Sequence, residues 1–172
     1  MKKVLVILFL AIINTAPHAA DFLVISDIGY SADSAGIGNV VGFSSDYNEL
    51  FGNPASLYRL PSSGASAFYT SLFNDMGLRY NAVSIGKKFT RSMLSIGLFE
   101  SKMDGLTRTG VNQYNEAIVD YEYSYQKMIG KVGFQYYINK NFSFGSSLNY
   151  YRVSFDDLSG HGGNIDIGIS SV

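Results

Sequence analysis

The side chains in this sequence that could carry out chemistry do not have the types and spacing of a reactive site. The 172 residues contain no cysteine and two histidines, His18 and His161. His161 lies in a Gly-rich stretch after Asp156 and Asp157, which lack the spacing of a Ca²⁺-binding loop. His18 falls within the leader described below, and one remaining histidine without cysteine cannot supply a transition-metal site. We therefore expect no metal site.

Motifs for nucleophilic attack or phosphate binding are also missing. The serines form no G-x-S-x-G elbow. Gly36-Ile37-Gly38 followed by Gly42 has the look of a phosphate-binding loop, but that loop needs a strand before it and a helix after it, and only strand-like patterning follows. A net charge of −1 is not that of a nucleic-acid-binding protein. We expect no catalytic residues and no cofactor, and therefore no enzymatic activity. We also expect no nucleic-acid partner.

The first twenty residues predict a secretory signal peptide. Lys2-Lys3 form a basic start, residues 4–13 an apolar core, and Asn14 to Ala20 a stretch of small and turn-forming residues. After residue 20 no apolar run reaches the roughly 18 residues of a membrane-spanning helix. The chain is expected to be exported, and to enter a membrane only as strands.

Residues 21–62 differ in composition from the rest of the chain. They are rich in Gly, Ser, Asn and Asp and show no sustained alternation of apolar and polar residues. A short helix is expected around Asp46 to Phe51, capped by Asp46 and ended by Asn53-Pro54, because the residue before a proline disfavours the helical region. We interpret this region as a compact segment apart from the strands.

Residues 63–172 predict antiparallel strands. Apolar and polar residues alternate over 65–73, 78–88 and 92–101, and again in a hairpin over 131–155 whose arms have about the length of a transmembrane strand. A last alternating stretch begins near residue 165. The connections near Thr90 and Lys140 are short, whereas the polar stretches 102–116 and 156–162 are expected to be long loops.

The alternation changes phase within one of these stretches. Its apolar residues are odd-numbered from Val119 to Tyr125 and even-numbered from Val132 to Ile138. A β-bulge near Met128–Gly130 inside one long strand is the first interpretation, and a tight turn there is the alternative.

Alternation alone does not distinguish a soluble sheet from a membrane barrel. Export, unequal loop lengths and the small residues on the polar face of the hairpin favour a transmembrane β-barrel in the outer membrane, with membrane lipid as its partner. Four polar residues become candidates for lining its lumen: Asp120, Glu122, Gln135 and Asp166.

One stretch carries a family resemblance. The residues GIGNVVGFSSDYNELFGNPASL contain Gly36, Gly38, Asp46 and then Asn53-Pro54-Ala55. In this order, and with the hairpins that follow, they resemble the N-terminal signature of the FadL-like outer-membrane proteins, including the PorV/PorQ branch. The chain departs from that signature at Gly52, where an aromatic residue is usual, and at Val40-Val41.

The resemblance implies a fold and a function. It makes Asn53, Pro54, Ala55, Gly36 and Gly38 part of a hatch that closes a barrel from inside, without any catalytic role. The whole barrel would let hydrophobic small molecules such as long-chain fatty acids pass passively. It also suggests a lateral exit at the expected bulge over 128–130.

The sequence supplies about six strands, fewer than the roughly eight of a minimal single-chain membrane barrel. We therefore expect an incomplete barrel, from a truncated or frame-shifted reading frame or from one piece of a split protein. Two other functions stay open: a PorV-like barrel component of a secretion system, which receives exported proteins, and a soluble exported β-protein with a binding role.

Overall fold

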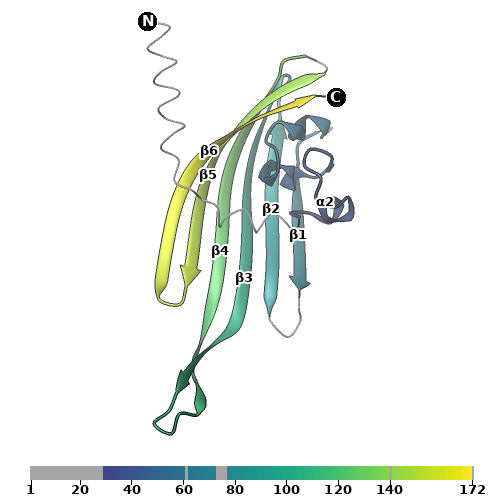
Figure 1. Ribbon diagram of the computed structural model, residues 1–172. Coiled ribbons are helices and arrows are strands. Elements are labelled where there is room, and N and C mark those ends of the chain that lie inside the picture. Colours follow the sequence, from purple (N-terminus) through teal and green to yellow (C-terminus); the bar gives the residue numbers. More distant parts are fainter. Residues whose placement is uncertain (1–28, 61, 73–76, 140, 172) are drawn as a thin grey trace, which may run out of the picture.

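The computed structural model describes residues 29–60, 62–72, 77–139 and 141–171. The expected signal peptide over 1–20 lies outside these ranges. The described chain is all-β in its main part, as expected, with six strands in one antiparallel sheet in chain order (Figure 1). The strands are β1 (Gly64–Leu72), β2 (Leu78–Lys88), β3 (Ser92–Val111), β4 (Ala117–Tyr137), β5 (Phe142–Phe155) and β6 (Leu158–Ser171).

Residues 29–60, called the N-terminal segment from here on, hold three short helices: α2 (Ala32–Gly36), η2 (Tyr47–Phe51) and η3 (Ser56–Arg59). The expected short helix is confirmed as η2, and the Asp46 carboxylate caps it by accepting from the backbone N–H of Asn48 at 2.8 Å. Among the described residues, no helix is both long and apolar enough to cross a membrane.

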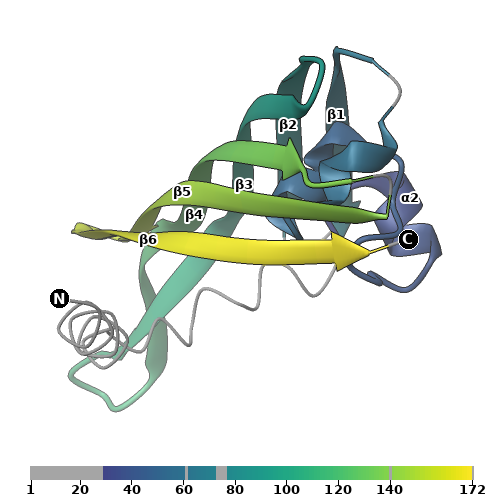
Figure 2. The same ribbon diagram turned by 90° about the horizontal axis from the view of Figure 1, so that it is seen from above.

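The sheet is curved and open. Within the described chain, β1 pairs only with β2 and β6 only with β5, so no closed barrel is formed. Figure 2, seen from above, shows the N-terminal segment within the curve, between β1 and the end of β6. We call the face toward this segment the inner face and the opposite one the outer face.

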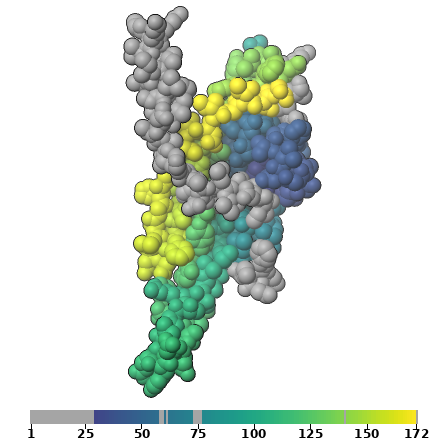
Figure 3. Space-filling view, viewed as in Figure 1, coloured from purple at the N-terminus to yellow at the C-terminus, as the bar shows by residue number. Residues whose placement is uncertain are grey.

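Both expected long loops are wrong. Strands β3 and β4 contain 20 and 21 residues, and only residues 112–116 connect them. At the other site, Asp156-Asp157 alone joins β5 to β6, with Asp156 at φ 55°, a value typical of tight hairpin turns. The β3–β4 hairpin projects beyond its neighbours, so water reaches both of its faces and its strands need no apolar side (Figure 3).

The expected bulge at 128–130 is also wrong. Strand β4 pairs in unbroken register with β5 from Tyr125 to Tyr137, and with β3 from Tyr125 to Tyr136. The irregularities of the β3–β4 pairing lie elsewhere: β3 has one extra residue between Met103 and Leu106, and β4 has one, Asp120, opposite the junction of Arg108 and Thr109. There is accordingly no break in the backbone pairing at 128–130 through which a lateral exit would open.

The phase change in the sequence reflects a change of surroundings and not of backbone. Odd-numbered side chains of β4 stay on the inner face along the strand, where Tyr123 packs on Phe155 of β5 with ring centroids 5.0 Å apart. Further along the same face, Lys131, Gly133 and Gln135 are buried under the N-terminal segment. The inner face carries aromatic side chains on the projecting hairpin and small or polar ones beneath the segment. The apolar residues of β4 therefore change from odd-numbered to even-numbered along the sequence although the strand keeps its orientation.

The two faces of the main sheet differ in polarity. In a soluble protein the apolar face is buried, whereas here the apolar face is the exposed one. Buried inner-face side chains are mostly small or polar: Ser84, Ser95, Ser101, Lys131, Gln135, Ser143, Ser147 and Asn149. Exposed outer-face side chains are large and apolar: Val83, Ile85, Leu94, Ile96, Leu98, Val132, Phe134, Tyr136, Phe142, Phe144, Leu148, Tyr150, Ile165, Ile167 and Ile169.

Candidate functional site

The inner face of the sheet is the candidate functional site, because the N-terminal segment touches every strand there. On β1 and β2, Tyr47 N donates to Ser66 Oγ (3.0 Å) and Ser84 Oγ donates to Asn48 Oδ1 (2.7 Å). On β4 and β5, Gln135 Nε2 and Ser143 Oγ both donate to Ala55 O (2.6 and 2.7 Å). On β6, Ile169 O accepts from Asn53 Nδ2 (3.4 Å). On β3, Leu50 and Phe51 pack over Gly97.

A track of glycines on successive strands makes this close approach possible. A Cβ added to Gly97 would lie 2.8 Å from Phe51 Cζ, and one added to Gly86 would lie 2.8 Å from Tyr47 Cδ1. A Cβ added to Gly133 would likewise collide with the Leu50 side chain, and one added to Gly168 would collide with the Asn53 side chain. At Gly145 the obstacle is backbone: an added Cβ would lie 2.5 Å from the Pro54 carbonyl carbon. Any side chain at this position would therefore push the segment away.

The Asn-Pro-Ala motif is the part of the segment seated on β4, β5 and β6. Asn53 Oδ1 accepts from the backbone N–H of Ala55 at 2.9 Å, an Asx turn that fixes the chain around Pro54. The turn directs the Ala55 carbonyl to Gln135 and Ser143, and Ala55 itself is fully buried. Two side-chain donors from neighbouring strands thus converge on one carbonyl of the segment.

Gly36 and Gly38 do not belong to this contact. Gly36 ends helix α2, and Gly38 follows it with φ 73°, a conformation that glycine adopts at little cost. A Cβ added to either glycine would meet nothing within 4 Å. The structure gives them a role in reversing the chain, away from Asn53, Pro54 and Ala55.

The four candidate lumen residues separate into two pairs. Gln135 and Asp166 lie on the inner face, where Asp166 forms a 2.8 Å ion pair with the 5% exposed Lys131. Asp120 and Glu122 lie on the projecting part of β4, and Asp120 is 3.9 Å from Arg108. Glu122 alternates with tyrosines that face inward and therefore lies on the other face of β4, whereas Asp120 is the extra residue at a register shift between β3 and β4.

Sequence reasoning missed several residues of the contact. Lys131 joins the inner face of the sheet to the segment, because its Nζ donates to Phe51 O at 3.4 Å as well as pairing with Asp166. Gly168 and Gly145, paired directly across β5 and β6, were not singled out as contacts of the motif. The signal was present in the sequence: a glycine recurs on the polar face of successive strands.

A buried polar cluster stabilises the segment internally. The Glu49 carboxylate accepts from the backbone N–H of Gly42 and is fully buried. Tyr30 is 1% exposed and packs its ring edge against Gly52, where a side chain would collide with it. Burial, reinforced by the negative charge of Glu49, raises the pKa of the Tyr30 hydroxyl well above its usual value.

The surface of the segment carries one perturbed carboxylate. The backbone N–H of Ser45 donates to Asp33 at 2.8 Å, and this bond lowers the pKa of the carboxylate, with hydroxyl donors assisting.

Over the described ranges, no three or more His, Cys, Asp or Glu side chains come together as metal ligands would. Comparisons with protein families, with curated proteins and with solved structures find no match to this chain.

Proposed function

We propose that this chain forms the hatch and part of the wall of an outer-membrane β-barrel of the FadL-like type, which passes hydrophobic small molecules such as long-chain fatty acids. The observation that carries the proposal is the inverted polarity of the sheet. Its large apolar side chains point away from the packed N-terminal segment, and its small and polar side chains are buried beneath that segment.

This polarity suits a lipid surface. The central outer row runs across five strands in register and is exposed at every position: Ile85 56%, Ile96 55%, Val132 43%, Leu148 62% and Ile165 66%. Leaving apolar surface in water costs about 25 cal/mol per Å². A soluble sheet avoids the cost by turning such a face inward, whereas a membrane barrel turns it to hydrocarbon.

The length of the apolar band supports the same interpretation. On β4 the outer side chains are apolar or glycine from Met128 to Tyr136, Ile138 follows directly after the strand, and Glu100 and Arg152 flank Met128 on the neighbouring strands. The ten residue steps from Met128 to Ile138, at about 3.3 Å each and tilted by about 45°, span roughly 23 Å. This is close to the apolar band of about 25 Å on membrane barrels.

The N-terminal segment supplies the gate in this proposal. It is bound to the inner face by side-chain hydrogen bonds, by close packing on glycines and by two apolar clusters, in which Tyr30 meets Phe99 of β3 and Leu50 meets Met93 of β3. Among the described residues it makes no strand pairs with the sheet. A segment attached in this way can leave without breaking the wall. The open edges of β1 and β6 require further strands to complete a barrel, because hydrocarbon cannot satisfy their free backbone groups.

Uptake of a radiolabelled long-chain fatty acid tests the transport role. Cells carrying the complete barrel should accumulate the label, and cells lacking the gene should not. A hydrophilic dye of similar size, which a closed hatch excludes, serves as the control. Equal fatty-acid uptake with and without the gene would refute transport.

A second function is favoured by one observation. The β3–β4 hairpin projects from the sheet and exposes Val111 (67%) and Tyr114 (74%) near its tip. Such a hairpin suits docking of an exported protein, as in a PorV-like secretion component. Removing residues 106–121 should then abolish co-purification of exported proteins and leave fatty-acid uptake unchanged.

A further inference from the structure

We propose that the outer face carries a site for one anionic phospholipid, with an acyl chain in a depression at Gly130 and the phosphate at Arg152 and His161. This inference rests on the proposed function, since it takes the outer face to be in contact with membrane.

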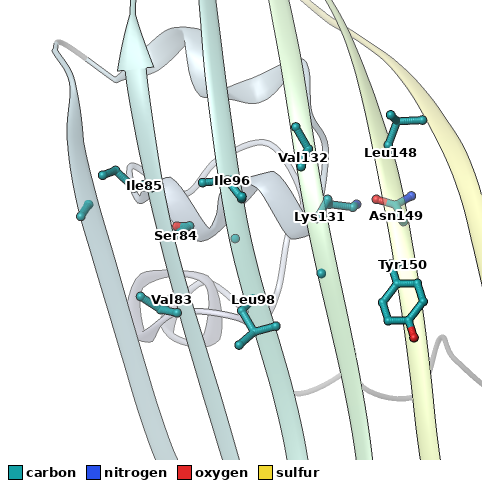
Figure 4. A pocket seen from close by; sticks show the side chains of 13 residues that line it. Val83, Ser84, Ile85, Ile96, Leu98, Lys131, Val132, Leu148, Asn149 and Tyr150 are labelled. Atoms are coloured by element: carbon teal, nitrogen blue, oxygen red, sulfur yellow. The ribbon is translucent and has the colours of Figure 1, made fainter. Parts of the chain in front are cut away.

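The depression is an interruption in the apolar outer face. It has a volume of about 740 Å³, and Figure 4 shows its labelled apolar side chains on the side of the sheet away from the N-terminal segment. Its apolar lining is Val83, Ile85, Ile96, Leu98, Val132, Leu148 and Tyr150, with Ala65 and Gly130. Small-molecule sites have volumes of about 300–1,000 Å³, so one acyl chain is a suitable occupant.

Gly130 creates the depression. It is paired with Leu98 on β3 and with Tyr150 on β5, so it leaves a gap between two large side chains. A Cβ added to Gly130 would meet nothing within 4 Å. Neither a turn nor a contact with the N-terminal segment requires glycine here, in contrast to Gly133 and Gly145.

A polar row begins one outward-facing position further along the strands. There Glu100, Met128, Arg152 and His161 lie in register on β3 to β6. Asn81 Nδ2 and Gln126 Nε2 both donate to the Glu100 carboxylate, with Asn81 at 3.2 Å. Among the described residues, Arg152 has no such partner, and it is exposed beside His161. The row therefore presents an unused cation next to the depression.

The spacing of these two features defines the occupant. Gly130 and Met128, and likewise Tyr150 and Arg152, are two residues apart, or about 7 Å along a strand. An amphiphile with an anion at the head of an alkyl chain matches that spacing, and guanidinium binds phosphate with two parallel hydrogen bonds. Because the site faces outward in the proposed barrel, its occupant is a phosphate-bearing lipid of the membrane.

Native mass spectrometry of the complete protein, reconstituted in phosphatidylcholine vesicles with a minor share of phosphatidylglycerol, tests the site by counting retained lipids. Arg152→Gln removes the cation, and Gly130→Leu fills the depression without a steric clash. The matched controls are Arg91→Gln, at the opposite end of the strands, and Ser146→Leu, on the outer face but outside the depression.

We expect the wild type to retain phosphatidylglycerol in preference to phosphatidylcholine. Arg152→Gln and Gly130→Leu should each lower this retention at least fivefold, and the controls should stay within twofold of wild type. Unchanged retention in both test variants, or an equal loss in Arg91→Gln, would overturn the site.

Displacement of the phospholipid by an equal amount of oleate would overturn the assignment of its occupant. If the wild type inserts in the vesicles but retains no lipid selectively, only this inference fails; if it does not insert, the membrane function fails as well.

Discussion

Single atoms decide how closely the N-terminal segment approaches the sheet. At Gly145 the backbone of Pro54 and Ala55 occupies the space that a side chain would need. At Gly52 the Tyr30 hydroxyl group does the same within the segment. These positions matter through the volume they leave empty, and neither glycine has the positive φ that would require it for conformational reasons.

Gly145→Ala should therefore detach the segment. The added Cβ would lie 2.7 Å from Ala55 Cα, and overpacking of this kind costs about 1–3 kcal/mol. We expect limited proteolysis within residues 29–60 to accelerate about tenfold or more, since 1.4 kcal/mol is a factor of ten. Gly160→Ala is the matched control, because nothing lies within 4 Å of its added Cβ. Equal cleavage rates in the two variants would contradict the glycine track.

Tyr30 makes attachment of the segment sensitive to alkaline pH. Its pKa is raised in the folded state, so the stability that it contributes is present below the ordinary tyrosine pKa of 10.0 and is lost progressively as the pH rises above that value. We expect proteolysis of the segment to increase above about pH 10 in the wild type. Tyr30→Phe cannot ionise at this position and should show a weaker rise; an identical pH profile would rule out Tyr30 as the cause.

At the scale of elements, the sequence predicted strands well and their ends poorly. All six strands and helix η2 were expected from alternation and capping residues. The stretches 102–116 and 156–162 were mistaken for loops because polarity was taken as absence of pairing, whereas most of their residues pair within the β3–β4 and β5–β6 hairpins. The bulge at 128–130 was inferred from a phase change that the backbone does not have.

Part of the candidate site was also within reach of the sequence. The Asn53-Pro54-Ala55 motif was identified, but its partners on the strands were not, since register determines which residues meet. Gln135 and Ser143 become two donors to one carbonyl only when β4 and β5 are paired as observed. Asp120 and Glu122 were grouped with Gln135 because the phase of β4 was misjudged.

The ion pair between β4 and β6 gives a prediction at this scale. Asp166→Asn leaves the ammonium group of the buried Lys131 without its carboxylate, which is usually worse than removing both charges. We expect Asp166→Asn to lower the free energy of urea-induced unfolding from vesicles by about 1–3 kcal/mol. The double variant Lys131→Met with Asp166→Asn should recover part of that loss. Strict additivity of the two single changes would show that the pair is not coupled.

At the scale of the whole molecule, one curved sheet separates two surroundings. The inner face holds the N-terminal segment through glycine contacts and polar donors, and the outer face presents a broad apolar surface. The change to charged residues at the row of Glu100 and Arg152 marks one limit of that surface. The β3–β4 hairpin continues past this limit, where its outer side chains include Glu122.

A charge placed within the apolar band should block membrane insertion. Ile96 lies at the centre of the band, and a lysine at the middle of a bilayer costs about 2–4 kcal/mol in a membrane barrel. We expect Ile96→Lys to reduce the inserted fraction in vesicle flotation, and Glu122→Lys on the projecting hairpin to leave it unchanged. If both variants insert equally, the outer face does not contact lipid.

The most direct test of the account is to ask which side of β4 meets the membrane. The sequence has no cysteine, so single cysteines can be introduced one at a time at 132, 134 and 136 and spin-labelled in vesicles. We predict that oxygen, which concentrates in hydrocarbon, relaxes these labels, while a polar nickel reagent does not reach them. A label at Glu122, on the projecting hairpin, should be reached by the nickel reagent. If the nickel reagent reaches 132, 134 and 136 freely, the apolar face lies in water, and the assignment to a membrane wall is wrong.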